Sequence, residues 1–193
     1  MMPSFASATR SATPFPHLRV TEILCRDDAD RLLLWLQEGA PWKLTVADFY
    51  EQYEFSLLNS PLATGMERLI QADFIETIAS SIEQSFGLDC KLDLVDVTAH
   101  KLIPGQTIRI HNDFIGSDET HRLLIQLNAG WRANQGGLLM LFSSDAPESL
   151  QSVLLPTHGS GFAFEISPNS FHAVSSINTG ERYTLVYTFF KSG

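Results

Sequence analysis

A histidine and an aspartate two positions apart are the first residues of this sequence that could do chemistry together. His111 and Asp113 stand at and just beyond the end of the segment Thr107–His111, whose alternating apolar residues are typical of a β-strand. Side chains at positions i and i+2 of a strand project to the same side, so this imidazole and carboxylate could bind one cation. Both residue types are common, and the pair alone is a weak signal.

A third candidate ligand lies much later in the sequence. His172 belongs to the segment Phe171-His172-Ala173-Val174, which begins a short strand. His172 lies 59 positions after Asp113. In a double-stranded β-helix, a separation of this length brings a late strand back beside an early one. Two imidazoles and one carboxylate on one face form the facial triad of non-haem iron oxygenases, which leaves coordination positions open for O2 and a chelating co-substrate. We therefore predict that His111, Asp113 and His172 bind Fe(II) and carry catalysis.

A single arginine adds a second kind of signal. Arg182 begins the apolar segment that runs from Tyr183 to Phe190, so its guanidinium is expected to point inward. A buried guanidinium needs an anionic partner, and no acid in the strand region clearly supplies one. The planar guanidinium can hold a carboxylate through two parallel hydrogen bonds. The sequence therefore predicts that Arg182 binds a carboxylate of a ligand.

The elements that must position these residues change in character near residue 88. The first part favours helices, which we predict around residues 27–36, more weakly over 45–58, and most clearly over 69–86, with Gly87 as a stop signal. Phe49, Tyr50 and Tyr53 are then expected on the buried face of the second helix. From Leu88 onward, short apolar segments alternate with turns such as Gly116-Ser117-Asp118, and the predicted strands include Thr107–His111, Arg122–Asn128, Leu138–Phe142, Val153–Leu155, Gly161–Ile166, Ser170–Ser175 and Arg182–Phe190.

This pattern predicts a mostly β protein, in which two packed sheets form a jelly roll, or double-stranded β-helix, braced by N-terminal helices. We expect residues 1–20 to form a loose leader and residues 21–193 to form a single domain. Within that domain, the helical support would cover about 21–87 and the jelly-roll core about 88–191.

Composition excludes some classes of partner. The net charge of −9 disfavours binding to the phosphate backbone of nucleic acids. There is no apolar run of about 18 residues that could span a membrane. The two cysteines, Cys25 and Cys90, form neither a disulfide framework nor a zinc motif, which favours a cytoplasmic location. A small molecule or a peptide is the expected substrate, and the oligomeric state is left open.

In its second half, from about Val97 to Phe190, the sequence resembles the iron(II)/2-oxoglutarate-dependent oxygenases, and among them the prolyl 4-hydroxylase-like group. The shared features occur in a fixed order along the chain: Ile103-Pro104-Gly105, His111-Asn112-Asp113, Leu123–Asn128, Trp131, Gly136-Gly137, Phe171-His172-Ala173-Val174 and Arg182-Tyr183-Thr184-Leu185. The resemblance implies that Fe(II) and 2-oxoglutarate are used with O2, and it makes ascorbate a candidate reductant.

The resemblance also implies roles for single residues. Arg182 would bind the distal carboxylate of 2-oxoglutarate. Gln126 stands where relatives often carry a tyrosine that bonds to the same carboxylate, and its amide could donate in place of the phenol. Leu102 replaces a second tyrosine of the group, and His100 and Lys101 are the candidates to substitute for it.

The reaction implied is hydroxylation of a C–H bond in an amino acid, a peptide or a natural-product intermediate, with release of succinate and CO2. Halogenases of the superfamily lack the metal carboxylate, so Asp113 argues against that chemistry. Nucleic-acid demethylases carry a second arginine where this sequence has Thr188. The remaining alternative, a non-catalytic or differently reacting cupin-like metal-binding protein, leaves Arg182 unexplained.

Overall fold

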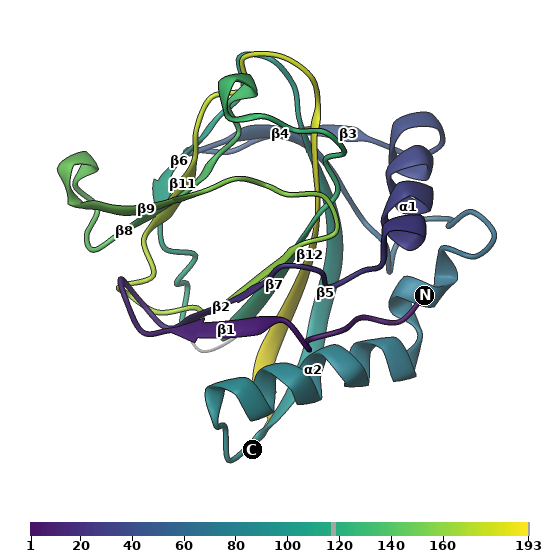
Figure 1. Ribbon diagram of the computed structural model, residues 1–193, viewed down its shortest axis with the longest axis horizontal. Helices are drawn as coiled ribbons and strands as arrows, with labels where there is room; N and C mark the ends of the chain where they lie inside the picture. Colours follow the sequence, from purple (N-terminus) through teal and green to yellow (C-terminus); the bar gives the residue numbers. More distant parts are fainter. Residues whose placement is uncertain (117–118, 193) are drawn as a thin grey trace.

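Two antiparallel β-sheets face each other in the computed structural model, which describes residues 1–116 and 119–192 (Figure 1). The larger sheet has the order β1-β2-β10-β7-β12-β5-β4-β3, and the smaller has the order β6-β11-β8-β9. The strands are β1 (Ala8–Ser11), β2 (His17–Val20), β3 (Lys43–Val46), β4 (Glu51–Ser56), β5 (Lys91–Leu102), β6 (Ile108–His111), β7 (His121–Gln126), β8 (Leu139–Phe142), β9 (Leu150–Leu154), β10 (Gly161–Glu165), β11 (His172–Val174) and β12 (Arg182–Ser192). The predicted jelly roll with N-terminal helices is confirmed.

The two faces of the larger sheet differ because side chains alternate along each strand. In β12, Tyr183, Leu185 and Tyr187 are fully buried in the main hydrophobic core, which the helices cover. Arg182 and Thr184, at the intervening positions, face the smaller sheet. β12 pairs with β5 on one side and β7 on the other, so it lies near the middle of the sheet.

Two helices pack on the face of the larger sheet that turns away from the smaller one (Figure 1). They are α1 (Arg26–Glu38) and α2 (Ala72–Phe86), and α2 follows a short 3-10 helix, Glu67–Ile70. In α2, Phe74, Ile78 and Ile82 are buried at the predicted helical spacing. Gly87 ends this helix in the left-handed conformation, with a φ of 70°. The first and last helices predicted from the sequence are thus confirmed.

The predicted helix over residues 45–58 is wrong, because this segment forms β3 and β4. Its apolar residues also fit helical spacing, but Tyr53 to Ser56 pair with β5 and so complete their backbone hydrogen bonds in the sheet. Tyr53 and Phe55 face the helices, whereas Gln52 and Glu54 face the cavity between the sheets. Phe49 and Tyr50 lie in the connection between β3 and β4 rather than on a helix.

The N-terminal residues are not a loose leader in the structure. Strand β1 pairs with β2, and β2 pairs with β10 of the jelly roll. Phe15 and Leu18 are buried, at 2% and 1% exposure. The physical reason is that β10 would otherwise present an unpaired edge, which β2 covers. The many Ser, Thr and Pro residues of this segment obscure the strand pattern in the sequence.

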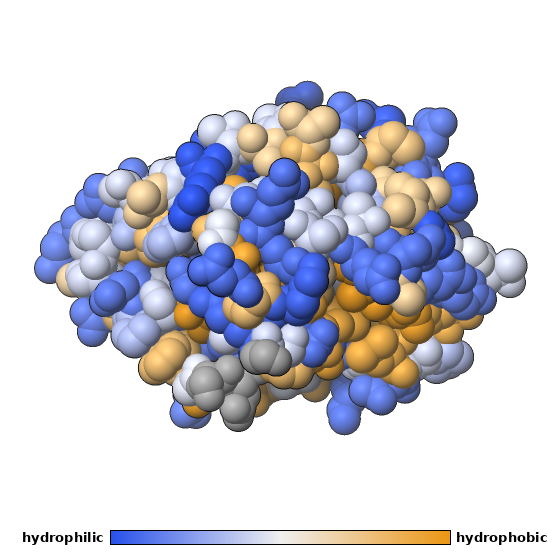
Figure 2. Space-filling model, turned by 90° about the horizontal axis from the view of Figure 1, so that it is seen from below, coloured by the Kyte–Doolittle hydropathy of each residue, from blue (hydrophilic) through white to orange (hydrophobic). Residues whose placement is uncertain are grey.

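The hydropathy of the surface is consistent with a core made of apolar side chains. Seen from below, the molecule shows mainly hydrophilic residues, with an apolar area toward the lower right (Figure 2). Within the described residues, none of the helices combines the length and apolar character needed to cross a bilayer. Part of the turn predicted at Gly116-Ser117-Asp118 lies outside the described residues.

The pairing of β2 predicts that the N-terminal segment contributes to stability. Leu18→Ala should lower the free energy of unfolding by about 2–5 kcal/mol, because it removes a fully buried side chain and leaves a cavity. Urea denaturation would measure this change. Arg19→Ala, at the exposed neighbouring position, is the control and should change stability by no more than about 0.5 kcal/mol. Equal stability of the two variants would contradict the role of this strand in the folded protein.

Candidate metal centre

The three predicted ligands lie together between the two sheets. Strands β6 and β11 are neighbours in the smaller sheet, and His172 pairs directly with His111. One ligand atom from each of His111, Asp113 and His172 lies within 4.8 Å of the others. The Nε2 atoms of His111 and His172 are each 3.3 Å from an oxygen of Asp113. The fold therefore brings together residues that are far apart in the sequence.

The backbone fixes the orientation of both imidazoles. His111 Nδ1 lies 2.8 Å from the carbonyl oxygen of Arg109, and His172 Nδ1 lies 2.8 Å from that of Ser170. A carbonyl only accepts, so each Nδ1 carries a proton and donates it. With Nδ1 engaged in this way, each ring turns its Nε2 toward Asp113. Two ring nitrogens and one carboxylate therefore converge on one point, an arrangement that a bound cation satisfies.

Asp113 reaches this position through its backbone and not through strand alternation. Strand β6 ends at His111, so the i and i+2 geometry expected from the sequence does not apply. Asp113 instead has a φ of 60°, the one positive value among the described non-glycine residues. Such a left-handed conformation costs free energy and is found preferentially at functional sites. It turns the carboxylate back toward the two imidazoles.

The carboxylate of Asp113 also contacts an arginine that the sequence analysis did not single out. Arg122 of β7 donates from Nη1 to Asp113 Oδ1 at 2.7 Å and from Nη2 to Glu119 at 2.6 Å. Burial alone would raise the pKa of Asp113, but the charge of Arg122 and the contacts with the two imidazoles hold it well below its usual value. The metal-facing carboxylate is therefore ionised. A charged residue within the predicted strand Arg122–Asn128 was the available signal for this contact.

Arg182 is buried in the same cavity, with 3% exposure. Its Nη1 donates to Thr184 at 2.9 Å, while Nε and Nη2 are buried without any hydrogen-bond partner among the described residues. Burial lowers the pKa of Arg182 to about 10, so the group stays charged at neutral pH. Buried polar groups are normally hydrogen-bonded, and a buried charge is normally paired. The guanidinium is therefore arranged to receive an anion.

Glycine is required beside this arginine. A Cβ atom at Gly137 would lie 2.8 Å from the Cδ of Arg182 and 2.6 Å from the Cδ1 of Ile177, and the residue has a φ of +66°. A side chain there would force Arg182 to move. Trp131 donates to the carbonyl of the preceding glycine at 2.9 Å, which fixes this loop.

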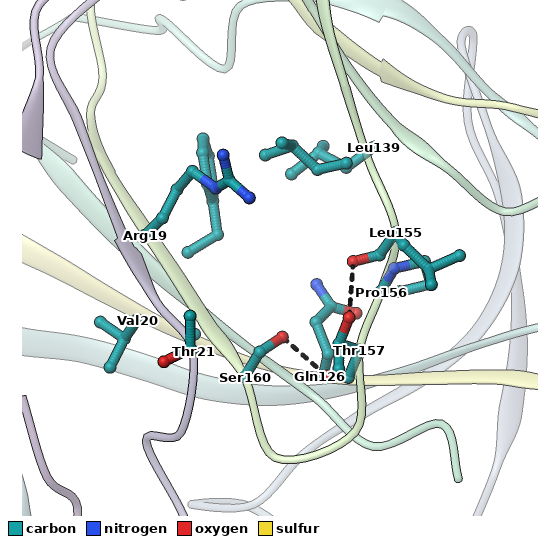
Figure 3. Close-up of a pocket in the computed structure, with 12 residues that line it drawn as sticks. Arg19, Val20, Thr21, Gln126, Leu139, Leu155, Pro156, Thr157 and Ser160 are labelled. Carbon is teal, nitrogen blue, oxygen red and sulfur yellow. Dashed lines mark hydrogen bonds between the residues drawn. The ribbon is translucent and has the colours of Figure 1, made fainter. Parts of the chain in front are cut away.

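Gln126 makes no direct hydrogen bond to Arg182 among the described residues. Its Oε1 accepts from Thr184 at 3.1 Å, which links it to Arg182 through the threonine. The side chain lines a second cavity of about 110 Å³, whose wall also includes Arg19 and Leu139 (Figure 3). Gln126 thus contacts the arginine site indirectly.

The structure separates the two candidates to substitute for the second tyrosine. His100 lines the cavity of the metal centre. Lys101 points to the opposite face of β5, where its Nζ lies over the rings of Trp42 and Tyr53. Burial, together with the charges of Arg122 and Arg182, lowers the pKa of His100 to about 3. His100 is therefore a neutral polar group at physiological pH.

Comparison with known proteins agrees with this geometry. The model of the 2OG-Fe(II) oxygenase superfamily matches residues 97–191. A prolyl-4-hydroxylase from Pseudomonas putida has a similar fold, with a TM-score of 0.66 and 18% identity over 98% of this chain and 96% of that one. A prolyl hydroxylase from Trichoplax adhaerens, solved with a hypoxia inducible factor peptide, has a TM-score of 0.68 and 14% identity over 90% and 83% of the two chains. No curated protein sequence matches this chain.

Residues 97–191 belong to the 2OG-Fe(II) oxygenase superfamily, and the chain has the fold of the prolyl hydroxylases. The protein is therefore an enzyme of the oxygenase class. The match covers the strands that carry His111, His172 and Arg182. The family predicted from these residues is thereby confirmed. The roles of the individual residues remain predictions.

The environment of His100 predicts that this imidazole does not titrate near neutral pH. NMR spectra should show no protonation of His100 between pH 8 and pH 5, with its signal identified by its absence in His100→Gln. An unfolded chain takes up this proton near pH 6.5, whereas the folded protein does so only near pH 3. The free energy of unfolding should therefore fall as pH drops through this window, and less steeply in His100→Gln. A midpoint near 6.5 in the folded protein would contradict the burial of this imidazole.

Proposed function

We propose that this protein is an Fe(II)/2-oxoglutarate-dependent hydroxylase that acts on a C–H bond of a small molecule or peptide and releases succinate and CO2. The observation that carries the proposal is the guanidinium of Arg182, which forms no ion pair with any described residue and is buried in one cavity with His111, Asp113 and His172. A cation-binding triad alone would suit many metal proteins. The adjacent arginine adds the anion site that a dicarboxylate co-substrate requires.

The donor set suits Fe(II). Two imidazole nitrogens and one carboxylate oxygen, contributed by His111, His172 and Asp113, form the ligand type of non-haem iron oxygenases. When bound, the iron and 2-oxoglutarate supply the oxidising chemistry with O2, and ascorbate can serve as reductant. The contribution of the chain is to orient each Nε2 toward the metal position through the hydrogen bond of Nδ1, and to keep Asp113 ionised beside Arg122.

Arg182 would bind the distal carboxylate of 2-oxoglutarate with Nε and Nη2, the atoms that have no other described partner. Thr184 receives the remaining hydrogen bond of the guanidinium and in turn donates to Gln126. We assign Gln126 to the co-substrate site through this chain, as a residue that orients Arg182 by way of the threonine.

Substrate has room beside the triad. A cavity of about 290 Å³ adjoins the metal centre, and its lining includes His111 and Asp113. This volume is near the lower limit of the roughly 300–1,000 Å³ typical of ligand sites. The structural relative from Trichoplax adhaerens was solved with a peptide fragment, and that precedent supports a peptide side chain as one possible substrate beside free small molecules.

The alternative function is a metal-binding protein of the same fold that does not hydroxylate. Chlorination is disfavoured because Asp113 fills the position that a halide would need. Mass spectrometry of the product separates the reaction types, because hydroxylation adds one oxygen atom, whereas demethylation releases formaldehyde.

The triad predicts iron-dependent turnover that is lost when one ligand is removed. With Fe(II) and ascorbate, the wild-type protein should convert 2-oxoglutarate to succinate, and His172→Ala should not. The variant should remain folded, because His172 lies in the cavity and not in the main hydrophobic core under the helices. Succinate can be measured by chromatography and folding by circular dichroism. Turnover in folded His172→Ala equal to wild type would refute the triad.

Arg182 predicts a separate effect on co-substrate binding. Arg182→Ala should weaken 2-oxoglutarate affinity by about 30-fold or more, because loss of a buried charged contact costs roughly 2–5 kcal/mol and each 1.4 kcal/mol is tenfold. Arg182→Lys should recover part of the loss, since lysine keeps the charge without the planar fork.

The measurement is an anaerobic titration of 2-oxoglutarate at saturating Fe(II), with iron affinity determined separately. Arg26→Ala is the matched control, because Arg26 is an exposed arginine of α1 on the far side of the larger sheet. Unchanged 2-oxoglutarate affinity in Arg182→Ala would remove this residue from the site.

A further inference from the structure

The cavity that adjoins the metal centre is lined by more carboxylates than cations. Glu54 of β4, Asp96 of β5 and Glu119 all contribute to its wall, in addition to the metal-facing Asp113. Arg122 is the one arginine in the described lining, and its guanidinium is already engaged by Asp113 and Glu119. Glu54 and Asp96 make no ion pair with any lysine or arginine of the described residues. The wall therefore carries an excess of negative charge.

The strand register places these groups in one region. Glu54 lies opposite His100 in the pairing of β4 with β5. Because His100 is neutral at physiological pH, it does not cancel the charge of Glu54. Asp96 pairs with Thr188 on β12. Alternation along β4 directs Gln52 and Glu54 to the cavity, while Tyr53 contacts Lys101 on the opposite face. The sequence thus puts polar side chains on the sheet face that looks toward the triad.

A buried amide in the same wall has an unused acceptor. Gln52 has 2% exposure, and its Nε2 donates to Glu54 Oε2 at 2.7 Å. Its Oε1 is buried without a hydrogen-bond partner among the described residues, and the side chain lines both this cavity and that of the triad. Exchanging the amide oxygen and nitrogen would place the oxygen against a carboxylate, so the unpaired atom is an acceptor. An unpaired acceptor beside a carboxylate requires a ligand that donates hydrogen bonds.

We infer that the substrate carries an organic cation, an ammonium or a guanidinium, whose N–H groups donate to Glu54 and to Oε1 of Gln52. The inference rests on the proposed function, since it takes the cavity beside the triad as the substrate site. A cation satisfies both the excess negative charge and the unused acceptor, whereas a neutral apolar group would leave both unpaired. The cation could belong to a free basic amino acid or to a basic side chain of a peptide.

Binding can be tested without turnover. The protein is loaded with Mn(II) and N-oxalylglycine, an analogue of 2-oxoglutarate that is not oxidised, and is titrated by calorimetry. The probes are Nα-acetyl-L-lysine amide, the corresponding norleucine derivative, which lacks the ammonium, and an Nε-acetylated form, which lacks the charge. Nα-acetyl-L-arginine amide tests the guanidinium, and free L-lysine distinguishes a free amino acid from a peptide residue.

We expect a lysine or arginine probe to bind at least about tenfold more tightly than the norleucine and Nε-acetyl probes, which corresponds to about 1.4 kcal/mol. Glu54→Gln should remove most of this preference, because the amide keeps an acceptor for Gln52 but loses the charge. Gln52→Leu should weaken binding of the same probe. Glu76→Gln makes the same change in net charge at an exposed position of α2 and should retain the preference.

The outcomes separate this inference from the proposed function. If Mn(II) and N-oxalylglycine bind but the charged and neutral probes have equal affinity, the cation site is wrong and the oxygenase site stands. If neither Mn(II) nor N-oxalylglycine binds, the oxygenase site is wrong. Even then, binding of the cationic probe that is lost in Glu54→Gln would support the cation site. Failure of the cationic probe to bind would refute the cation site. A preference that survives in Glu54→Gln also overturns the inference, because the charge would then be recognised elsewhere.

Discussion

The alternation of side chains along β12 is the constraint on which the rest of this structure depends. One set of its residues, including Leu185 and Tyr187, fills the core under the helices, and the other set, including Arg182 and Thr184, faces the smaller sheet. A shift of one residue would place the guanidinium in the hydrophobic core and expose the apolar side chains to the cavity. Because β12 pairs with both β5 and β7, its register also sets the positions of His100 and Arg122.

Polar groups buried between two sheets destabilise the folded protein unless they form hydrogen bonds or ion pairs. Arg182 has two buried nitrogens without a hydrogen-bond partner, and Asp113 and Gln52 each have a buried oxygen without one, within the described part of the chain. Each such group would destabilise the fold if nothing bound to it. A metal ion, a dicarboxylate and a cationic substrate would together satisfy the three kinds of group. Binding would then stabilise the folded protein as well as prepare the reaction.

The larger sheet separates the main hydrophobic core from the candidate site, which lies beside a smaller hydrophobic cluster that includes Leu141 and Phe162. Its outer face is held by α1 and α2, while its inner face supplies Glu54, His100 and Arg182 to the cavities between the sheets. The main core therefore lies away from the site residues. The same arrangement of sheets occurs in the Pseudomonas putida protein at 18% identity, so different sequences can build this fold.

The sequence by itself determined the family, the jelly roll, the two long helices and the set of residues that could bind a metal and a carboxylate. The family came from the resemblance of motifs that occur in a fixed order from Val97 to Phe190. The other features follow from local patterns: the alternation of apolar residues, the helical spacing in α2 and the residue types near His111 and His172. Only the tertiary structure decided that residues 45–58 form strands and that the N-terminal segment joins the sheet. Both depend on hydrogen bonds to strands that are remote in sequence, β5 and β10. The contact of Arg122 with Asp113 and the acidic wall around Glu54 were decided in the same way, because distances between side chains on different strands are set by register, which no local pattern records.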